Sequence, residues 1–178
     1  MSALPRVLLE TPDGDLTVEV DIGAAPLTAG HFLEFVRRGY LSGSGIYRIV
    51  TPANDRSSPA ISVVQFGWLS ASMDDFPLPP MPHEATSRTG LRHLDGSISL
   101  ARLEPGTGRC TFFFCIGDQP ELDEGGRRAG DGLGFAVFGQ LVEGREVLGS
   151  LFHRAREREI LLPPLAISGH VLQPANRP

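Results

Sequence analysis

A charged residue stands inside an apolar, strand-like segment of this chain. The segment GIYRIV places Arg48 between apolar neighbours, and the segment ISVVQFG carries Gln65 where its apolar run ends. A guanidinium stays charged at any working pH and can donate hydrogen bonds to charge that develops only in a transition state. Taken singly, Arg48 is better explained by snorkelling or an ion pair at a strand edge, and Gln65 by the start of a turn.

Histidines near carboxylates suggest a second chemistry. His83 is followed by Glu84, and His93 lies two positions before Asp95. Both pairs belong to the long connection over residues 66–96, and folding of this connection back on itself would bring metal ligands together, as in a metal-dependent hydrolase. Isolated pairs in a loop are more typical of solvated or structural histidines. We therefore predict no metal and no cofactor.

The composition and the missing motifs exclude several other classes. The chain has no phosphate-loop glycine pattern, no G-x-G-x-x-G between strand and helix, and no G-x-S-x-G elbow. Its net charge is −5 without a run of Lys or Arg, which argues against a nucleic-acid partner. No segment approaches the roughly 20 apolar residues of a membrane span. We expect one domain over residues 1–178, with its core at about 6–172, monomeric, cytoplasmic and without a membrane partner.

Period-two alternation predicts the elements that must position these residues. The segment LTVEVD alternates apolar and polar residues, and TPDGD before it supplies the turn that pairs it with RVLLET as a hairpin. Further short strands are predicted at 46–50, 61–65, 97–101, 111–116, 135–141 and 164–172. Helical spacing appears only in PLTAGHFLEFVRRG and EGREVLGSLF. The pattern favours a mainly β fold, a closed eight-stranded antiparallel β-barrel with two helices covering its ends.

The segment CTFFFCIGD contains three consecutive phenylalanines. In an extended strand Phe112 and Phe114 point to one face and Phe113 to the other, so both faces need an apolar partner. The barrel core explains only one of these faces. Cys110 and Cys115 lie five positions apart, which is about 16 Å along a strand and too far for a disulfide. Two reduced thiols are expected, as in a reducing compartment.

Several separated segments, in order, resemble the cyclophilins, which are peptidyl-prolyl cis/trans isomerases. The segments are the N-terminal hairpin, PLTAGHFLEFVRRGY, YRIV, a strand ending in Gln, GSISLAR, PGTGRCTFFFCIGDQPELD and GFAVFGQLVEGREVL. The resemblance runs from about residue 6 to 172 and is closest to bacterial members. It implies an enzyme that rotates Xaa-Pro bonds and assists protein folding, with proline-containing peptides or unfolded chains as partners.

The resemblance also implies a site on the outer face of the barrel. By position, Arg48 and Gln65 match the catalytic residues, and Phe113 matches the aromatic floor of a pocket for the proline ring. The implied substrate-binding residues are Phe113, Leu122, Leu100, Ala101, Thr111, Phe135, Tyr47 and Phe66. A prolyl amide rotates over a barrier of about 18–20 kcal/mol because resonance is lost on twisting. A guanidinium that donates to the imide nitrogen would stabilise the twisted state alone.

Three residues depart from the family pattern. Tyr47 stands where histidine usually precedes the arginine, Phe66 replaces the first of two glycines after the glutamine, and Thr111 replaces a glutamine or glutamate. A bulky Phe66 where the backbone needs freedom predicts a reshaped groove. The alternative function is therefore a cyclophilin-like module that binds proline-containing peptides with little or no turnover.

Overall fold

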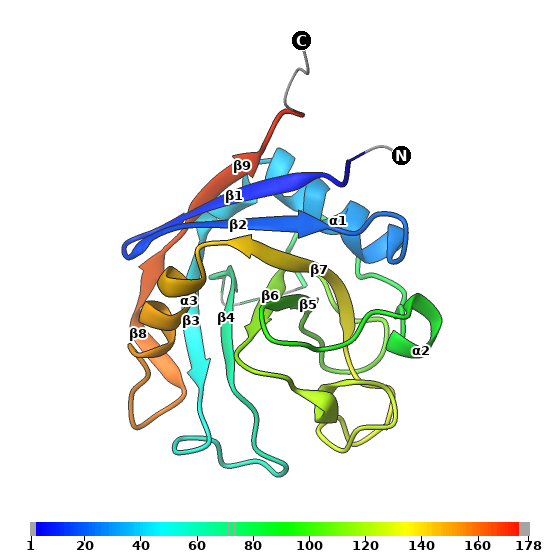
Figure 1. The fold of residues 1–178 in the computed structure, drawn as a ribbon, viewed down its shortest axis with the longest axis vertical. Helices are drawn as coiled ribbons and strands as arrows, with labels where there is room; N and C mark the ends of the chain where they lie inside the picture. Colours follow the sequence, from blue (N-terminus) through cyan, green and yellow to red (C-terminus); the bar gives the residue numbers. More distant parts are fainter. Residues whose placement is uncertain (1–2, 71, 73, 175–178) are drawn as a thin grey trace.

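Nine antiparallel strands form one sheet that curls into a nearly closed barrel (Figure 1). The computed structural model describes residues 3–70, 72 and 74–174. Its strands are β1 (Arg6–Thr11), β2 (Gly14–Val20), β3 (Ser44–Val50), β4 (Val63–Trp68), β5 (Ser97–Leu100), β6 (Thr111–Cys115), β7 (Ala136–Glu143), β8 (Ile160–Ala166) and β9 (Ser168–Val171). Their order in the sheet is β8-β3-β4-β6-β5-β7-β2-β1-β9. The predicted fold class and the β1–β2 hairpin are confirmed.

The C-terminal segment, which we predicted as one strand, forms two strands, so nine strands are found instead of eight. β8 pairs with β3 at one edge of the sheet and β9 pairs with β1 at the other, and only Ile167 separates the two strands. Ile167 is buried in the core. The chain bends at Ile167, so β8 pairs with one edge of the sheet and β9 with the other. This single segment thus brings the two edges of the sheet together. The predicted strand at 164–172 begins too late because Pro163 and Pro164 interrupt the strand-like pattern.

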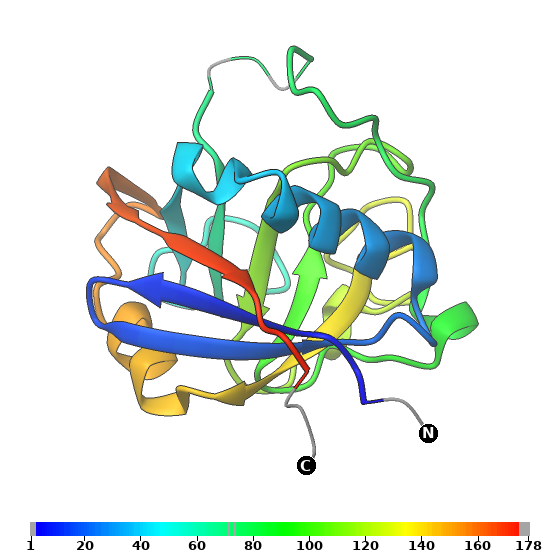
Figure 2. The ribbon, with the colours of Figure 1, turned by 90° about the horizontal axis from the view of Figure 1, so that it is seen from above.

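Two main helices pack against the barrel from separate sides (Figure 2). α1 (Pro26–Arg37) inserts Phe32 and Phe35 into the core, and α3 (Arg145–Phe152) inserts Leu148 and Leu151. Both helices lie within the predicted segments. A short helix, α2 (Thr86–Thr89), and two 3-10 turns at Tyr40–Gly43 and Pro120–Leu122 were not predicted. In the part of the chain that the structure describes, no helix is long and apolar enough to cross a membrane.

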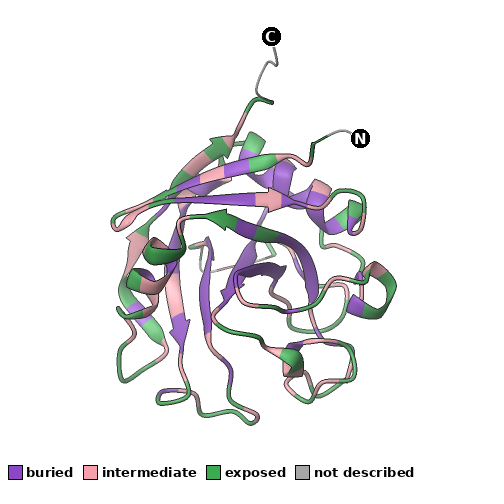
Figure 3. Cartoon of the chain, viewed as in Figure 1, coloured by how far each residue is buried: buried purple, intermediate pink, exposed green. Residues whose placement is uncertain are grey.

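The interior and the outer face of the barrel hold separate apolar clusters. β4 and β6 are buried along almost their whole length (Figure 3). Phe112 and Phe114 belong to the main core, whereas Phe113 belongs to a smaller group that we call the outer cluster. The outer cluster consists of Val50, Ile61, Val63, Phe113, Cys115 and Leu122, with Ala101 and Phe135 packed against it. The predicted division of the three phenylalanines is confirmed, and both cysteines are buried and outside any disulfide.

A glutamate from a distant loop caps the N-terminus of α1. The residue before the helix, Ala25, has no side-chain acceptor. Instead, the Glu84 carboxylate accepts hydrogen bonds from the Thr28 amide and hydroxyl, both at 2.6 Å, and from the Leu27 amide at 3.3 Å. Glu84 is 3% exposed. A buried carboxylate here satisfies the free amides of the first turn and complements the positive end of the helix dipole.

We predict that Glu84→Ala destabilises the protein by about 1 to 3 kcal/mol, because it leaves buried N–H and O–H donors without an acceptor. Urea unfolding followed by circular dichroism would measure the loss. Glu84→Gln retains one acceptor oxygen and should lose less stability. An alanine variant as stable as the parent would show that the cap contributes nothing.

Candidate active site

One row of paired residues crosses the outer face of the sheet. Arg48 of β3 is the register partner of both Ile160 in β8 and Gln65 in β4. Gln65 in turn pairs with Phe113 in β6, and Phe113 pairs with Ser99 in β5. Directly opposed residues in a sheet point to the same face. The row therefore places a guanidinium, an amide and an aromatic ring side by side on three neighbouring strands.

A β-bulge in β3 brings Tyr47 to the same face as Arg48. Ile46 pairs with Phe66 and Arg48 pairs with Gln65, so Tyr47 is an extra residue without a partner in β4. Strict alternation would place Tyr47 and Arg48 on opposite faces. With the bulge, Ile46 and Ile49 both enter the core while the two residues between them face outward.

Hydrogen bonds join the bulge to the row. Arg48 donates from Nη1 to Gln65 Oε1 at 2.8 Å, and Gln65 donates from Nε2 to the Tyr47 hydroxyl at 2.7 Å. Burial raises the pKa of Tyr47 above its ordinary value, so the hydroxyl that accepts from Gln65 is protonated. Arg48 also donates from Nη2 to Glu159 Oε2 at 2.9 Å. Its guanidinium is thus held on both sides, and one quarter of its side chain remains exposed to solvent.

Phe113 is supported by a buried histidine. The His93 ring lies parallel to the Phe113 ring, with 5.9 Å between centroids. His93 Nδ1 lies 2.7 Å from the Asp123 carboxylate and Nε2 lies 3.0 Å from the Ser99 hydroxyl. Burial lowers the pKa of His93, although the Asp123 hydrogen bond opposes the shift. Asp123 directly follows Leu122. The His93 ring therefore links Phe113 to the segment that carries Leu122.

Phe135 forms another wall of the outer cluster. Its ring meets Phe113 edge to face, with 5.7 Å between centroids. The Arg102 guanidinium lies over Phe135 at 5.1 Å and binds both oxygens of Asp131, at 2.8 and 2.9 Å. These hydrogen bonds lower the pKa of Asp131 to about 2. The loop that carries Phe135 is therefore tied to the end of β5.

A cavity of about 380 Å³ opens beside the row. Four predicted site residues contribute to its wall, namely Tyr47, Gln65, Ala101 and Thr111. Ala101 also packs against the outer cluster, so the cavity and the cluster adjoin each other. Phe113 is only 5% exposed and Leu122 1%. A ligand would thus meet a cavity lined partly by polar side chains, next to the tightly packed outer cluster.

Two predicted substrate-binding residues do not lie at this surface. Phe66 is fully buried in the main core, where its ring packs against Phe112 and Phe114. Leu100 is also in the main core, opposite Phe112. Both predictions are wrong for the same reason: in β4 and β5 these residues immediately follow outward-facing Gln65 and Ser99, so alternation turns them inward.

The glycine requirement in β4 falls on Gly67 rather than on position 66. Gly67 has a φ of +152°, and a Cβ there would lie 2.2 Å from the Cys110 carbonyl oxygen. Non-glycine residues with positive φ are absent from the described chain, so Phe66 adopts an ordinary strand conformation. The groove reshaping that we predicted from Phe66 is therefore wrong.

The histidine and carboxylate pairs have structural partners. His83 Nε2 lies 2.9 Å from the Leu133 carbonyl, and Glu84 caps α1. His93 supports Phe113, while Asp95 accepts from the Gly117 amide at 2.7 Å and pairs with Arg145. Within the described ranges, no group of three or more His, Cys, Asp or Glu is arranged to hold a metal ion. The two pairs that suggested a metal-dependent hydrolase thus bind other partners.

Several residues of the site could not be identified from the sequence pattern. Val50, Ile61 and Val63 complete the outer cluster, and their period-two positions relative to Arg48 and Gln65 are the only signal they carry. Glu159 and His93 act across long sequence separations, on Arg48 and Phe113 respectively. No local pattern links such pairs.

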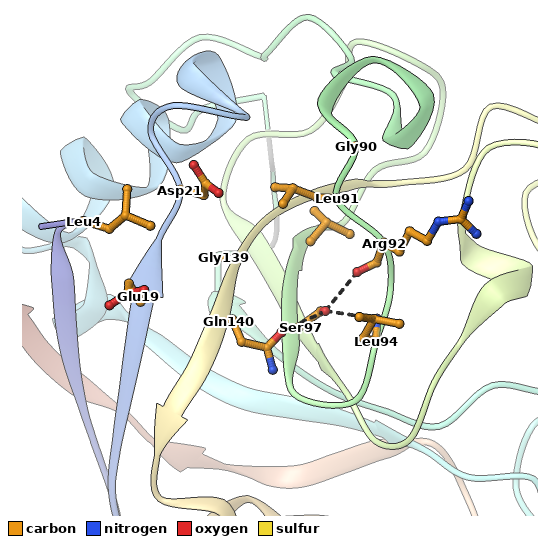
Figure 4. Close-up of a pocket in the computed structure, with 11 residues that line it drawn as sticks. Leu4, Glu19, Asp21, Gly90, Leu91, Arg92, Leu94, Ser97, Gly139 and Gln140 are labelled. Carbon is orange, nitrogen blue, oxygen red and sulfur yellow. Dashed lines mark hydrogen bonds between the residues drawn. The ribbon is translucent and has the colours of Figure 1, made fainter. Parts of the chain in front are cut away.

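A second cavity, of about 290 Å³, lies between β2, β7 and the segment over residues 90–97 (Figure 4). Several of its polar groups bind one another: the Ser97 hydroxyl contacts the Arg92 carbonyl, the Leu94 amide and the Gln140 side chain. None of the predicted site residues lines it. The candidate site is therefore the row with its adjoining cavity.

We predict that the protein loses stability as the pH falls from about 7 to 5. Burial lowers the folded-state pKa of both His31 and His93. The stability contributed by the two neutral histidines is complete above the ordinary histidine pKa of about 6.5. It is lost as the pH falls from there through the lower folded-state pKa values, because in this interval the unfolded chain binds protons that the folded chain does not. Urea unfolding at several pH values measures this slope. A flat or rising stability toward pH 5 would contradict it, and His93→Asn should reduce the slope.

The chain is similar in sequence and in fold to known proteins. Peptidyl-prolyl cis-trans isomerase A of Dickeya dadantii is 33% identical over 143 residues, which cover 80% of this chain and 68% of that protein. The Streptomyces antibioticus isomerase cyp18 is 28% identical over 150 residues, covering 83% of each. A Cryptosporidium parvum cyclophilin, crystallised in the presence of the dipeptide Ala-Pro, has a similar fold, with a TM-score of 0.70 at 18% identity over 96% of this chain and 99% of that one.

A second solved structure, the cyclophilin AquaCyp293 of Hirschia baltica, has a TM-score of 0.68 at 17% identity and covers 92% of this chain and 72% of that one. Because both identities are low, the two solved structures establish the fold of this chain and nothing beyond it. The family model described as cyclophilin type peptidyl-prolyl cis-trans isomerase/CLD matches residues 6–167. With this match over nearly the whole barrel, the chain belongs to the cyclophilin-type peptidyl-prolyl cis-trans isomerase family.

Proposed function

We propose that the row on the outer face catalyses rotation of Xaa-Pro bonds, with Arg48 and Gln65 as its catalytic residues. The observation that carries this proposal is the continuous register of Arg48, Gln65 and Phe113 across β3, β4 and β6. It sets a fixed cation one strand away from an amide and two strands away from an aromatic floor. Membership of an isomerase family supports the same assignment.

The reaction needs a donor that becomes useful only as the amide twists. In the planar amide the nitrogen lone pair is delocalised into the carbonyl and accepts hydrogen bonds poorly. Rotation localises the lone pair, and a donor on Arg48 can then bind it. Such an interaction lowers the barrier without strengthening ground-state binding. No covalent bond forms or breaks.

The other residues of the site hold the peptide for this rotation. The exposed edge of Phe113, with Ala101 and Phe135 beside it, provides an apolar contact for the proline ring. Leu122 supports these residues from within the outer cluster. Gln65, Tyr47 and Thr111 line the adjoining cavity, where the backbone before the proline can bind polar groups. Holding both sides of the rotating bond reduces the entropy lost on reaching the transition state.

The cellular role that fits this activity is assistance to protein folding in a bacterial cytoplasm. Isomerisation of Xaa-Pro bonds is slow enough to limit folding. Two buried cysteines that form no disulfide are compatible with a reducing compartment, and burial raises the pKa of the Cys110 thiol to about 11. Proline-containing segments of unfolded chains are the proposed substrates.

We predict that Arg48→Ala lowers kcat/KM by about 10²- to 10³-fold, the loss typical of a single transition-state donor. Arg48→Lys should recover little activity, because an ammonium does not reproduce the planar fork of donors. A protease-coupled or NMR exchange assay on a short Xaa-Pro-Phe peptide measures both variants. Peptide binding should change much less than turnover.

The thermal unfolding midpoint of each variant is the necessary control, since a misfolded barrel would also lose activity. A well-folded Arg48→Ala variant with parental turnover would remove Arg48 from the mechanism. A parent protein that binds the peptide without accelerating its exchange would instead support the proline-peptide binding module.

A further inference from the structure

The catalytic arginine has a second anchor that comes from far along the chain. Arg48 Nη2 donates to Glu159 Oε2 at 2.9 Å, while Nη1 donates to Gln65 on the opposite side. The Arg48 and Glu159 side chains are 25% and 37% exposed. Isolated pairs with this exposure contribute little to stability. This pair differs from an isolated one because it binds the guanidinium of the proposed catalytic residue.

The backbone holds Glu159 in place beside β3. The Ile49 amide donates to the Glu159 carbonyl at 2.8 Å, and the next residue, Ile160, is the register partner of Arg48. Buried Asn54 adds a further tie, since its side-chain amide donates to the carbonyls of Ile49 at 3.0 Å and Arg156 at 2.9 Å. The segment that carries Glu159 is thus fastened to β3 next to the arginine. The Glu159 side chain therefore extends to Arg48 from a backbone that is hydrogen-bonded to β3.

Two acceptors on the two terminal nitrogens define the plane of the guanidinium. Gln65 alone would leave Arg48 free to rotate about that single contact, and an arginine side chain has many rotamers to lose. A carboxylate on the other nitrogen removes this freedom before substrate binds. The guanidinium has five N–H donors, so donors remain for the imide nitrogen.

We propose that Glu159 is a positioning residue that orients Arg48 for catalysis. The inference rests on the proposed function, in which Arg48 acts on the twisting amide. Glu159 acts through its hydrogen bond to Arg48 and makes no contact with the substrate. Its removal therefore slows the chemical step and leaves peptide binding largely intact.

Three variants test this with the Xaa-Pro-Phe exchange assay. Glu159→Ala should lower kcat about three- to ten-fold with KM within about two-fold of the parent, as expected for lost orientation. Glu159→Gln keeps an acceptor oxygen and should retain most of kcat. Glu157→Ala removes another exposed carboxylate of the same segment and should match the parent. Parental kcat in Glu159→Ala, or a glutamine variant as slow as the alanine variant, would overturn the proposal.

A double variant tests whether Glu159 works through Arg48. In an Arg48→Ala background, Glu159→Ala should cause no further loss of kcat, because the group it orients is gone. An equal fractional loss in both backgrounds would show that Glu159 acts independently of the arginine and would overturn the inference.

NMR gives a readout that does not depend on turnover. In the parent protein, rotation about the Arg48 Cζ–Nε bond should be slow and its Nη protons resolved, and Glu159→Ala should accelerate the rotation while the unfolding midpoint stays unchanged. Equal rotation rates in parent and variant would overturn the positioning role. A parent protein without isomerase activity would overturn the proposed function alone, and the rotation rates would still decide whether Glu159 orients Arg48.

Discussion

The alternation of side chains along β6 is the constraint on which the rest of the site depends. Phe112 and Phe114 fill the barrel interior, and the same backbone geometry then turns Phe113 to the outer face. An aromatic ring on that face would be exposed without further cover. The outer cluster supplies the cover, with residues from the neighbouring strands and from the loop that contains Leu122. The apolar floor of the site is therefore a consequence of how the barrel fills its core.

The bulge in β3 solves a related problem for polar residues. Arg48 and Tyr47 must both face outward if they are to meet Gln65, yet an unbroken strand would turn one of them into the core. One extra residue in β3 restores the inward positions of Ile46 and Ile49 on either side. The core keeps its packing, and the outer face gains two adjacent polar side chains. A local irregularity in pairing thus creates the hydrogen-bonded group of Tyr47, Gln65 and Arg48.

Buried polar side chains connect the loops to this framework. Glu84 fastens its loop to α1, His93 connects the outer cluster to β5, and Arg102 ties the loop bearing Phe135 to the end of the same strand. In the described residues, every buried side-chain nitrogen and oxygen has a hydrogen-bond partner. Unpaired groups at these depths would cost stability, so each contact specifies one arrangement of its loop. These hydrogen bonds hold the loops around the site against the strands and α1.

Local signals in the sequence predicted most strands, the two main helices and the facing of the phenylalanines, because period-two alternation, helical spacing and turn residues do not depend on tertiary contacts. The order of its motifs also identified Arg48, Gln65 and Phe113 as partners. The inward turn of Phe66 and Leu100 was also readable from their neighbours, although the motif resemblance assigned them to the groove. Tertiary contacts set which residues oppose one another across strands, where β3 bulges, how the chain bends at Ile167 between β8 and β9, and which distant side chains reach the site. Glu159 meets Arg48, and His93 meets Phe113, through pairings of strands and loops far apart in the chain. Such contacts depend on the closure of the whole barrel, and no local pattern of residue types encodes them.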